Sequence, residues 1–146
     1  MQQQMNKLSE HAYIEVHRSC PDTDTVKDIL WARPASIELL HAFLHELIID
    51  CTYKNNMYRV PLIEIVGAIS TDMTFSVAFA YLKAEQEDNF GWCLDSLKYL
   101  MHDRLIPSIV VTDRNLALMN IVKRIFSTYC HFLCRQHIRK KYYYSL

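Results

Sequence analysis

The chain has 146 residues, which is the length of one ordinary domain, since most domains have about 100 to 150 residues. Hydrophobic residues make up 51% and charged residues 22% of the sequence, so the composition is that of a folded globular protein. The 16 basic and 16 acidic side chains balance to a net charge of zero. This balance excludes an overall basic field for attracting nucleic acid, but not a local basic patch.

Glycine and cysteine narrow the class of protein further. The sequence has 2 glycines, Gly67 and Gly91, whereas glycine-rich phosphate loops need several in one short stretch. We therefore expect no nucleotide cofactor. The 5 cysteines include no CxxC pair, which favours a reducing compartment. No apolar run is long enough to span a membrane, and the N-terminal residues lack a signal-peptide core, so we expect an intracellular protein without a membrane segment.

The N-terminal part of the chain shows little pattern. Residues 1–26 are mixed and weakly periodic, and we expect a poorly structured lead-in there, before a domain that spans residues 27–146. Pro34 suits a first helical turn. Apolar side chains recur at helical spacing after it, so a short amphipathic helix is predicted over residues 35–44.

Three strands are predicted next. The apolar run 47–49 is too short for a helix and ends at Asp50, which indicates a buried strand that carries a carboxylate at its end. Residues 62–69 are predicted to form a second strand just after Pro61. Residues 75–81 alternate with a period of two and give the clearest strand of the chain. The short turns between the three strands predict an antiparallel meander.

The pattern then changes to a helical period. Asp88 can cap a helix with one apolar face, and we expect this helix to cross over the sheet. Residues 108–113 form another short apolar strand, which ends at Asp113. A second helix follows and carries its apolar stripe as far as Ile125, and then a further strand is predicted over residues 129–133.

This order of elements is β-β-β-α-β-α-β-α, with one helix before it. Parallel neighbours need a crossover of a dozen or more residues, so strands separated by helices after a meander imply a mixed sheet. The sequence therefore predicts an α/β protein with the order of elements found in the ribonuclease H-like fold.

Asp50 and Asp113 form the candidate catalytic and metal-binding pair. Ligands of open α/β sheets gather at the carboxyl ends of strands, so the two carboxylates would converge if their strands are neighbours. A hard divalent ion such as Mg²⁺ or Mn²⁺ would neutralise them, and two such ions can activate water and stabilise a leaving phosphate-ester oxygen. The alternative, which the pattern alone favours, is that each aspartate merely ends its strand or that Asp113 caps the following helix.

Cys134 and His137 form a CxxH motif four residues after Cys130. Two thiolates and an imidazole could approach one zinc ion. No recognised spacing supplies a fourth ligand, although His131 and His102 are candidates. A buried cysteine and a helix-facing histidine are therefore favoured over a zinc site.

The last residues of the chain mix basic and aromatic side chains. Residues 135–144 include two arginines, two lysines and three tyrosines, a mixture also found on surfaces that follow a nucleic-acid backbone. Such a run is more often the solvated end of a helix, and composition alone favours this second interpretation.

Several of these segments together resemble the transposase domain of plant Mutator-like elements (MULE), over about residues 27–140. They are 28–32 (DILWA), 49–56 (IDCTYKNN), 61–67 (PLIEIVG), 111–114 (VTDR), 117–120 (ALMN) and 134–137 (CRQH). The resemblance implies a ribonuclease H-like core of the DDE type, which nicks and joins DNA with divalent metal ions in the nucleus. It matches Asp50 and Asp113 to the first two catalytic aspartates, and Cys134 with His137 to the CxxH signature of the family.

The sequence departs from the family at both ends. The resemblance implies a third acidic residue well downstream, but no acidic residue follows Asp113. Residues 1–26 also hold no counterpart of the zinc finger that such proteins use to find element ends. We therefore expect a C-terminally truncated catalytic core with weak or absent strand cleavage.

An alternative function belongs to another class. Transposase-derived proteins related to the far-red-impaired-response family act as DNA-binding transcriptional regulators, in which the core is a scaffold for dimerisation or partner binding. The retention of both Asp50 and Asp113 favours recent descent from an active enzyme, because a regulator does not need them. A decayed copy without function is the third reading that the sequence leaves open.

Overall fold

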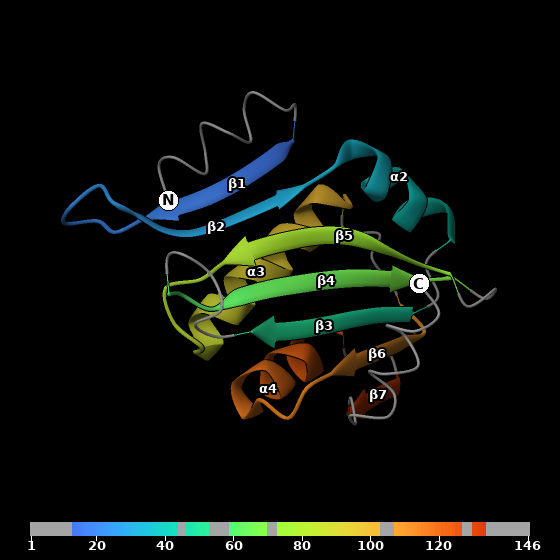
Figure 1. Ribbon diagram of the computed structural model, residues 1–146. Helices are drawn as coiled ribbons and strands as arrows, with labels where there is room; N and C mark the ends of the chain where they lie inside the picture. The colour runs from blue at the N-terminus through green and yellow to red at the C-terminus, as the bar shows by residue number, and fades with distance from the viewer. Residues whose placement is uncertain are drawn as a thin grey trace.

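The computed structural model describes residues 13–43, 46–52, 59–69, 73–102, 107–126 and 130–133. In this part of the chain, seven strands form one sheet, and helices cover one of its faces (Figure 1). The strands are β1 (Ile14–Ser19), β2 (Val26–Ala32), β3 (Glu46–Thr52), β4 (Leu62–Ala68), β5 (Thr74–Tyr81), β6 (Ile109–Thr112) and β7 (Cys130–Leu133). The helices are α2 (Pro34–Phe43), α3 (Glu87–Leu100) and α4 (Leu116–Ile125).

The order of strands in the sheet is β1-β2-β5-β4-β3-β6-β7. Antiparallel pairing of β3 with β4 and of β4 with β5 confirms the predicted meander. β6 and β7 are parallel neighbours beyond β3, so the predicted mixed sheet is also confirmed. Helix α3 connects β5 to β6 across the two strands between them, which is the crossover that a parallel neighbour of β3 requires.

The hydrophobic core lies between the sheet and α3 and α4, which lie behind the sheet in Figure 1. Leu47 and Ile49 of β3 are buried in this core, and because strand side chains alternate, Asp50 belongs to the opposite face. We call that opposite face the front face, since it is the one that Figure 1 presents to the viewer. Because Leu47 and Ile49 point into the core, the side chain of Asp50 points away from it.

The N-terminal hairpin is the main difference from the predicted organisation. β1 and β2 pair antiparallel, and Ile14 lies opposite Ala32. Residues 13–26 therefore contain an edge strand and a turn, where we expected a poorly structured lead-in. Every residue of β1 is at least partly exposed, and its apolar side chains alternate only at Ile14 and Val16, which is too short a pattern to identify a strand.

The two predicted helix starts can be compared with the structure. α3 begins at Glu87 with Gln86 as its N-cap residue, so the prediction that Asp88 caps the helix is wrong. The carboxylate of Asp88 instead accepts hydrogen bonds from Arg18 of β1 (2.7 Å) and Lys27 of β2 (3.3 Å). The predicted first helix corresponds to α2, which begins at Pro34, so the placement of Pro34 in its first turn is confirmed.

Candidate active site

The two candidate aspartates lie at the same level of neighbouring strands. β3 and β6 are parallel partners, and Ile49 pairs with Thr112 in their register. Asp50 and Asp113 are the next residues along the two strands. The condition for the two carboxylates to converge, which is that their strands are neighbours, is therefore met. β3 differs from the prediction in continuing to Thr52, two residues beyond Asp50.

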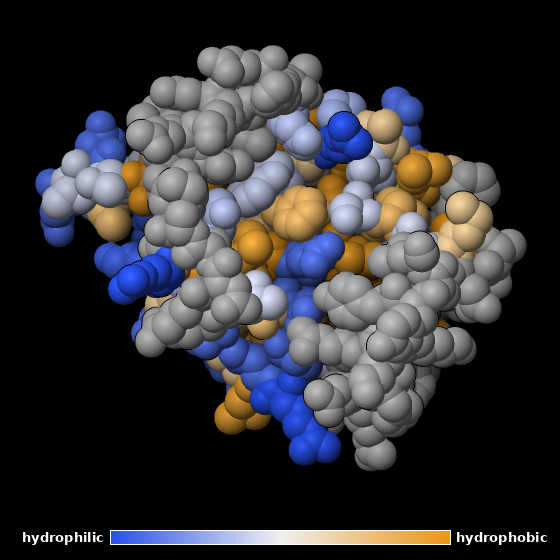
Figure 2. Space-filling model, viewed as in Figure 1, coloured by the Kyte–Doolittle hydropathy of each residue, from blue (hydrophilic) through white to orange (hydrophobic). Residues whose placement is uncertain are grey.

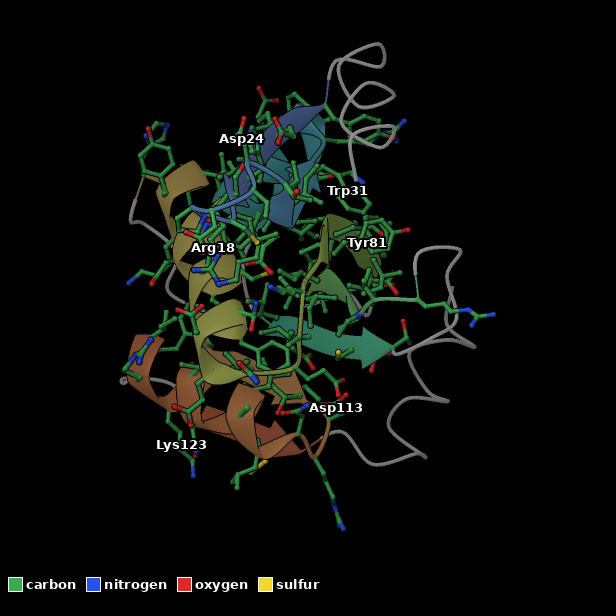
Figure 3. The ribbon with its side chains drawn as sticks, turned by 90° about the vertical axis from the view of Figure 1, so that its left-hand side faces the viewer. Arg18, Asp24, Trp31, Tyr81, Asp113 and Lys123 are labelled. Carbon is green, nitrogen blue, oxygen red and sulfur yellow. The ribbon has the colours of Figure 1, made fainter. Side chains whose placement is uncertain are left out.

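The carboxylate of Asp113 reaches toward β3. Its Oδ2 accepts a hydrogen bond from the backbone N–H of Cys51 (3.4 Å), the residue next to Asp50. Its Oδ1 accepts one from the backbone N–H of Asn115 (3.3 Å). Figure 3 shows Asp113 between the helices and the front face, which carries Trp31 and Tyr81.

Asp113 does not cap the following helix. The N-cap residue of α4 is Asn115, whose Oδ1 accepts a hydrogen bond from the backbone N–H of Leu118 (3.1 Å). The alternative interpretation that Asp113 serves as the cap is therefore wrong. The carboxylate of Asp113 is held instead by the backbone N–H groups of Cys51 and Asn115.

Glu64 adds a third carboxylate beside this pair, and the sequence interpretation assigned it no role. It lies on β4 directly opposite Asp50, and directly opposite residues of an antiparallel pair share a face of the sheet. Burial, and then the negative charge of Asp50, raise the pKa of Glu64. Both causes favour the protonated form of the Glu64 carboxyl over the charged form.

Cys51 lies next to Asp50 in the sequence, and its side chain contacts a further carboxylate. Its Sγ donates a hydrogen bond to Oε1 of Glu85 (3.0 Å), a residue of the turn before α3. Burial raises the pKa of the Cys51 thiol most, and the hydrogen bond to Glu85 and the charges of Glu85, Asp113 and Asp50 raise it further. The raised pKa favours the protonated thiol, which does not suit a thiolate nucleophile.

The donor atoms of the two aspartates suit a hard cation. Carboxylate oxygens are the ligands that Mg²⁺ takes, and Mg²⁺ commonly uses one or two carboxylates with water and substrate phosphates for the rest. Among the residues that the structure describes, no three His, Cys, Asp or Glu side chains form a group that could hold a metal ion. An ion here would thus depend on Asp50, Asp113 and ligands from solvent or substrate. Cys134 and His137 lie outside the described residues.

Replacing Glu64 with glutamine is expected to raise the melting temperature near neutral pH but not in acid. A carboxyl whose pKa is raised by folding stabilises the protein below its unfolded pKa, about 4.3 for glutamate, and this contribution is lost as pH rises through the folded pKa. Glutamine does not ionise, so the variant avoids that loss. Melting curves of both proteins at about pH 3.5 and about pH 7 measure the difference.

The effect of this substitution depends on Asp50. Since the charge of Asp50 contributes to the raised pKa of Glu64, Glu64→Gln should stabilise the Asp50→Asn variant less than the unchanged protein. A lower melting temperature for Glu64→Gln at both pH values would contradict the electrostatic account.

Comparisons with known proteins agree with the resemblance found in the sequence. Residues 46–141 match the model of the MULE transposase domain family. The chain is 25% identical over 138 residues to Protein FAR1-RELATED SEQUENCE 5 of Arabidopsis thaliana, which covers 94% of the chain and 17% of that protein. It is also 25% identical over 114 residues to the PKS-NRPS hybrid synthetase cheA of Chaetomium globosum, covering 77% of the chain and 2% of that protein. The chain thus spans a small part of the length of the curated relatives that it matches.

Proposed function

Because this chain belongs to the MULE transposase domain family, we propose that it is the ribonuclease H-like core of a DNA transposase. In this proposal, Asp50 and Asp113 are the first two carboxylates of a DDE site that cleaves and joins DNA strands. The observation that carries the proposal is the position of Asp50 on β3 and of Asp113 directly after β6. Each follows the paired residues Ile49 and Thr112, and the Asp113 carboxylate accepts a hydrogen bond from the backbone of β3.

The arrangement of the strands supports the ribonuclease H-like assignment. The antiparallel meander β5-β4-β3 is followed in the sheet by the parallel strands β6 and β7, with α3 and α4 in the connections. In this arrangement β3 is central, and it carries the first aspartate. The hairpin of β1 and β2 extends the sheet at the meander side and leaves the proposed site at the other side.

Asp50 and Asp113 would hold Mg²⁺ or Mn²⁺. The bound ions would supply activation of a water molecule and stabilisation of the leaving oxygen. The chain itself orients Asp113 through the backbone N–H groups of Cys51 and Asn115 and places Glu64 opposite Asp50. No acidic residue follows Asp113 in the sequence, so we expect these 146 residues to bind the metal but to cleave DNA weakly.

Calorimetric titration with Mn²⁺ tests the site directly. We expect saturable binding by the unchanged protein and its loss in both Asp50→Asn and Asp113→Asn. Asn115→Ala is the matched control. It removes a helix cap next to the site but keeps the backbone N–H of residue 115, which donates a hydrogen bond to Asp113. This control should lose about 1 kcal/mol of stability and keep its affinity for Mn²⁺. Absence of binding, or binding that neither aspartate substitution alters, would exclude the metal-dependent function.

A second candidate is a transposase-derived DNA-binding regulator or interaction module. The observation that favours it is the match to Protein FAR1-RELATED SEQUENCE 5, which covers 94% of the chain, whereas the match to the family model begins at residue 46. A scaffold does not need its carboxylates. Binding to DNA or to a partner should then survive Asp50→Asn with the fold preserved, and its loss in that variant would contradict the scaffold.

DNA as the substrate would place this protein in the nucleus, and a fluorescent fusion in cells would show its location. In the described part of the chain, no helix is long and apolar enough to cross a membrane. Homodimerisation is a further part of the proposal, and light scattering during purification would measure it.

A further inference from the structure

Three aromatic side chains form a cluster on the front face of the sheet. The rings of Trp31 on β2 and Phe79 on β5 are stacked, with centroids 5.7 Å apart and planes at 21°. The ring of Tyr81 lies 5.2 Å from that of Trp31, at 40°. All three side chains are partly exposed and lie outside the hydrophobic core behind the sheet. The core therefore does not account for them.

The cluster and the proposed active site belong to one row across the sheet. Trp31 pairs with Phe79, Phe79 with Glu64, and Glu64 with Asp50. Neighbouring strands are about 4.8 Å apart, so Phe79 lies about 10 Å from Asp50 along this row. A few nucleotides of an extended strand span such a distance. Figure 2 shows hydrophobic side chains gathered on this face, with hydrophilic ones among them.

The charges in the row favour a nucleobase over a phosphate. Glu15 pairs with Trp31 on one side of the cluster, and Glu64 pairs with Phe79 on the other. Carboxylates repel phosphate groups, but they accept hydrogen bonds from amino groups at the edges of bases. Glu15 is already hydrogen-bonded to Nδ1 of His17, and a wholly apolar partner would desolvate this pair and the carboxyl of Glu64. The surface therefore suits flat rings with N–H groups at their edges.

We propose that Trp31 and Phe79 stack against an unpaired base of the DNA strand whose phosphate lies at Asp50 and Asp113. This inference rests on the proposed function and adds a preference for a single-stranded flank over an intact duplex, because bases in a duplex are already stacked and paired. Every base offers an aromatic face, so the contact selects unpaired DNA rather than a particular sequence.

Tryptophan fluorescence tests the contact, because the chain has 2 tryptophans. Trp92→Phe leaves Trp31 as the one reporter, and Trp31→Phe leaves Trp92, which lies on α3 with the guanidinium of Arg18 5.5 Å from its ring centre. We expect a short oligodeoxycytidylate, whose bases carry amino groups, to quench the fluorescence of Trp92→Phe and to leave that of Trp31→Phe unquenched. An oligomer of equal length with abasic sugars should cause no quenching, since it has the phosphates but no bases.

Affinity for the same oligomer provides the second measurement. Trp31→Ala should weaken binding about tenfold or more, in line with alanine substitutions at other base-stacking residues, and Trp31→Phe should retain most of it. The unchanged protein, Trp31→Ala and Trp31→Phe should all have the same affinity for a blunt duplex. Circular dichroism compares their folds, and Trp31→Phe keeps the test valid if the alanine variant does not fold.

Several outcomes would overturn the stacking proposal. The first two are no quenching of Trp31 fluorescence by the oligomer and equal quenching by the abasic oligomer. The third is tighter binding to the blunt duplex than to the single strand. The fourth is quenching that grows with protein concentration in the absence of DNA, which would indicate a second copy of the chain on this face. The Mn²⁺ titration is independent of these readings. Stacking without metal binding would remove the catalytic function and leave only the contact between the base and the aromatic cluster. Metal binding without stacking would remove the stacking proposal and leave the proposed function.

Discussion

Replacing Asp28 with alanine is expected to destabilise the fold by several kcal/mol, since each buried donor that is left without its acceptor costs about 1 to 3 kcal/mol. The side chain of Asp28 is fully buried, and its Oδ2 accepts a hydrogen bond from Nε of Arg18 (2.5 Å). Its Oδ1 accepts one from the backbone N–H of Lys83 (2.9 Å) and one from Nδ2 of Asn89 (3.0 Å). Alanine would leave these donors without their acceptor, and Asn89 is itself buried.

Urea unfolding of matched variants measures this cost. Asp88 also accepts a hydrogen bond from Arg18, but its side chain is 67% exposed, so Asp88→Ala should cost less than about 1 kcal/mol. Asp28→Asn keeps an oxygen acceptor for Lys83 and should fall between the two. Equal losses for Asp28→Ala and Asp88→Ala would show that the buried network does not hold the hairpin to α3.

The network around Asp28 also bears on the proposed active site. The backbone N–H of Lys83, which Asp28 anchors, is two residues before Glu85, the carboxylate that accepts the hydrogen bond of Cys51. The turn between β5 and α3 is thus fixed from the hairpin side of the sheet. Loss of Asp28 should therefore loosen the position of Glu85 as well as lower stability.

The fold was predictable where side-chain size or polarity alternates in the sequence. β5 alternates large with small side chains from Phe75 to Tyr81, and this period of two identified the strand, although a register shift against β4 leaves Val77 and Ala78 both buried. β1 lies at an edge and is partly exposed along its length, so β2 supplies the pairing that makes it a strand. Such pairing is a tertiary effect, and local sequence carries little sign of it.

The site was predictable in part for a related reason. Asp50 and Asp113 each follow a short apolar run, so their positions at strand ends could be inferred locally. Glu64 lies beside Asp50 because of the register between β3 and β4, which the alternation of each strand alone does not determine. Asp113 and Asn115 are both good helix caps in sequence, and the structure assigns the cap to Asn115.

Strand cleavage should appear when a third carboxylate is supplied. We expect Mn²⁺-dependent nicking of supercoiled plasmid by a longer polypeptide in which these residues are followed by a helix that carries a glutamate. In that polypeptide, Asp50→Asn or Asp113→Asn should lower the nicking rate by about a hundredfold or more. A divalent ion contributes several kcal/mol to such a transition state, and each 1.36 kcal/mol is about a factor of ten in rate.

The control for nicking is Asn115→Ala in the same longer polypeptide. It removes the cap of α4 but no carboxylate, so its nicking rate should stay within a few-fold of the parent once folding is confirmed by circular dichroism. A longer polypeptide that binds Mn²⁺ through Asp50 and Asp113 but does not nick would restrict the pair to metal binding. One that neither binds nor nicks would leave the scaffold function, because a scaffold needs the sheet and the hairpin but neither aspartate.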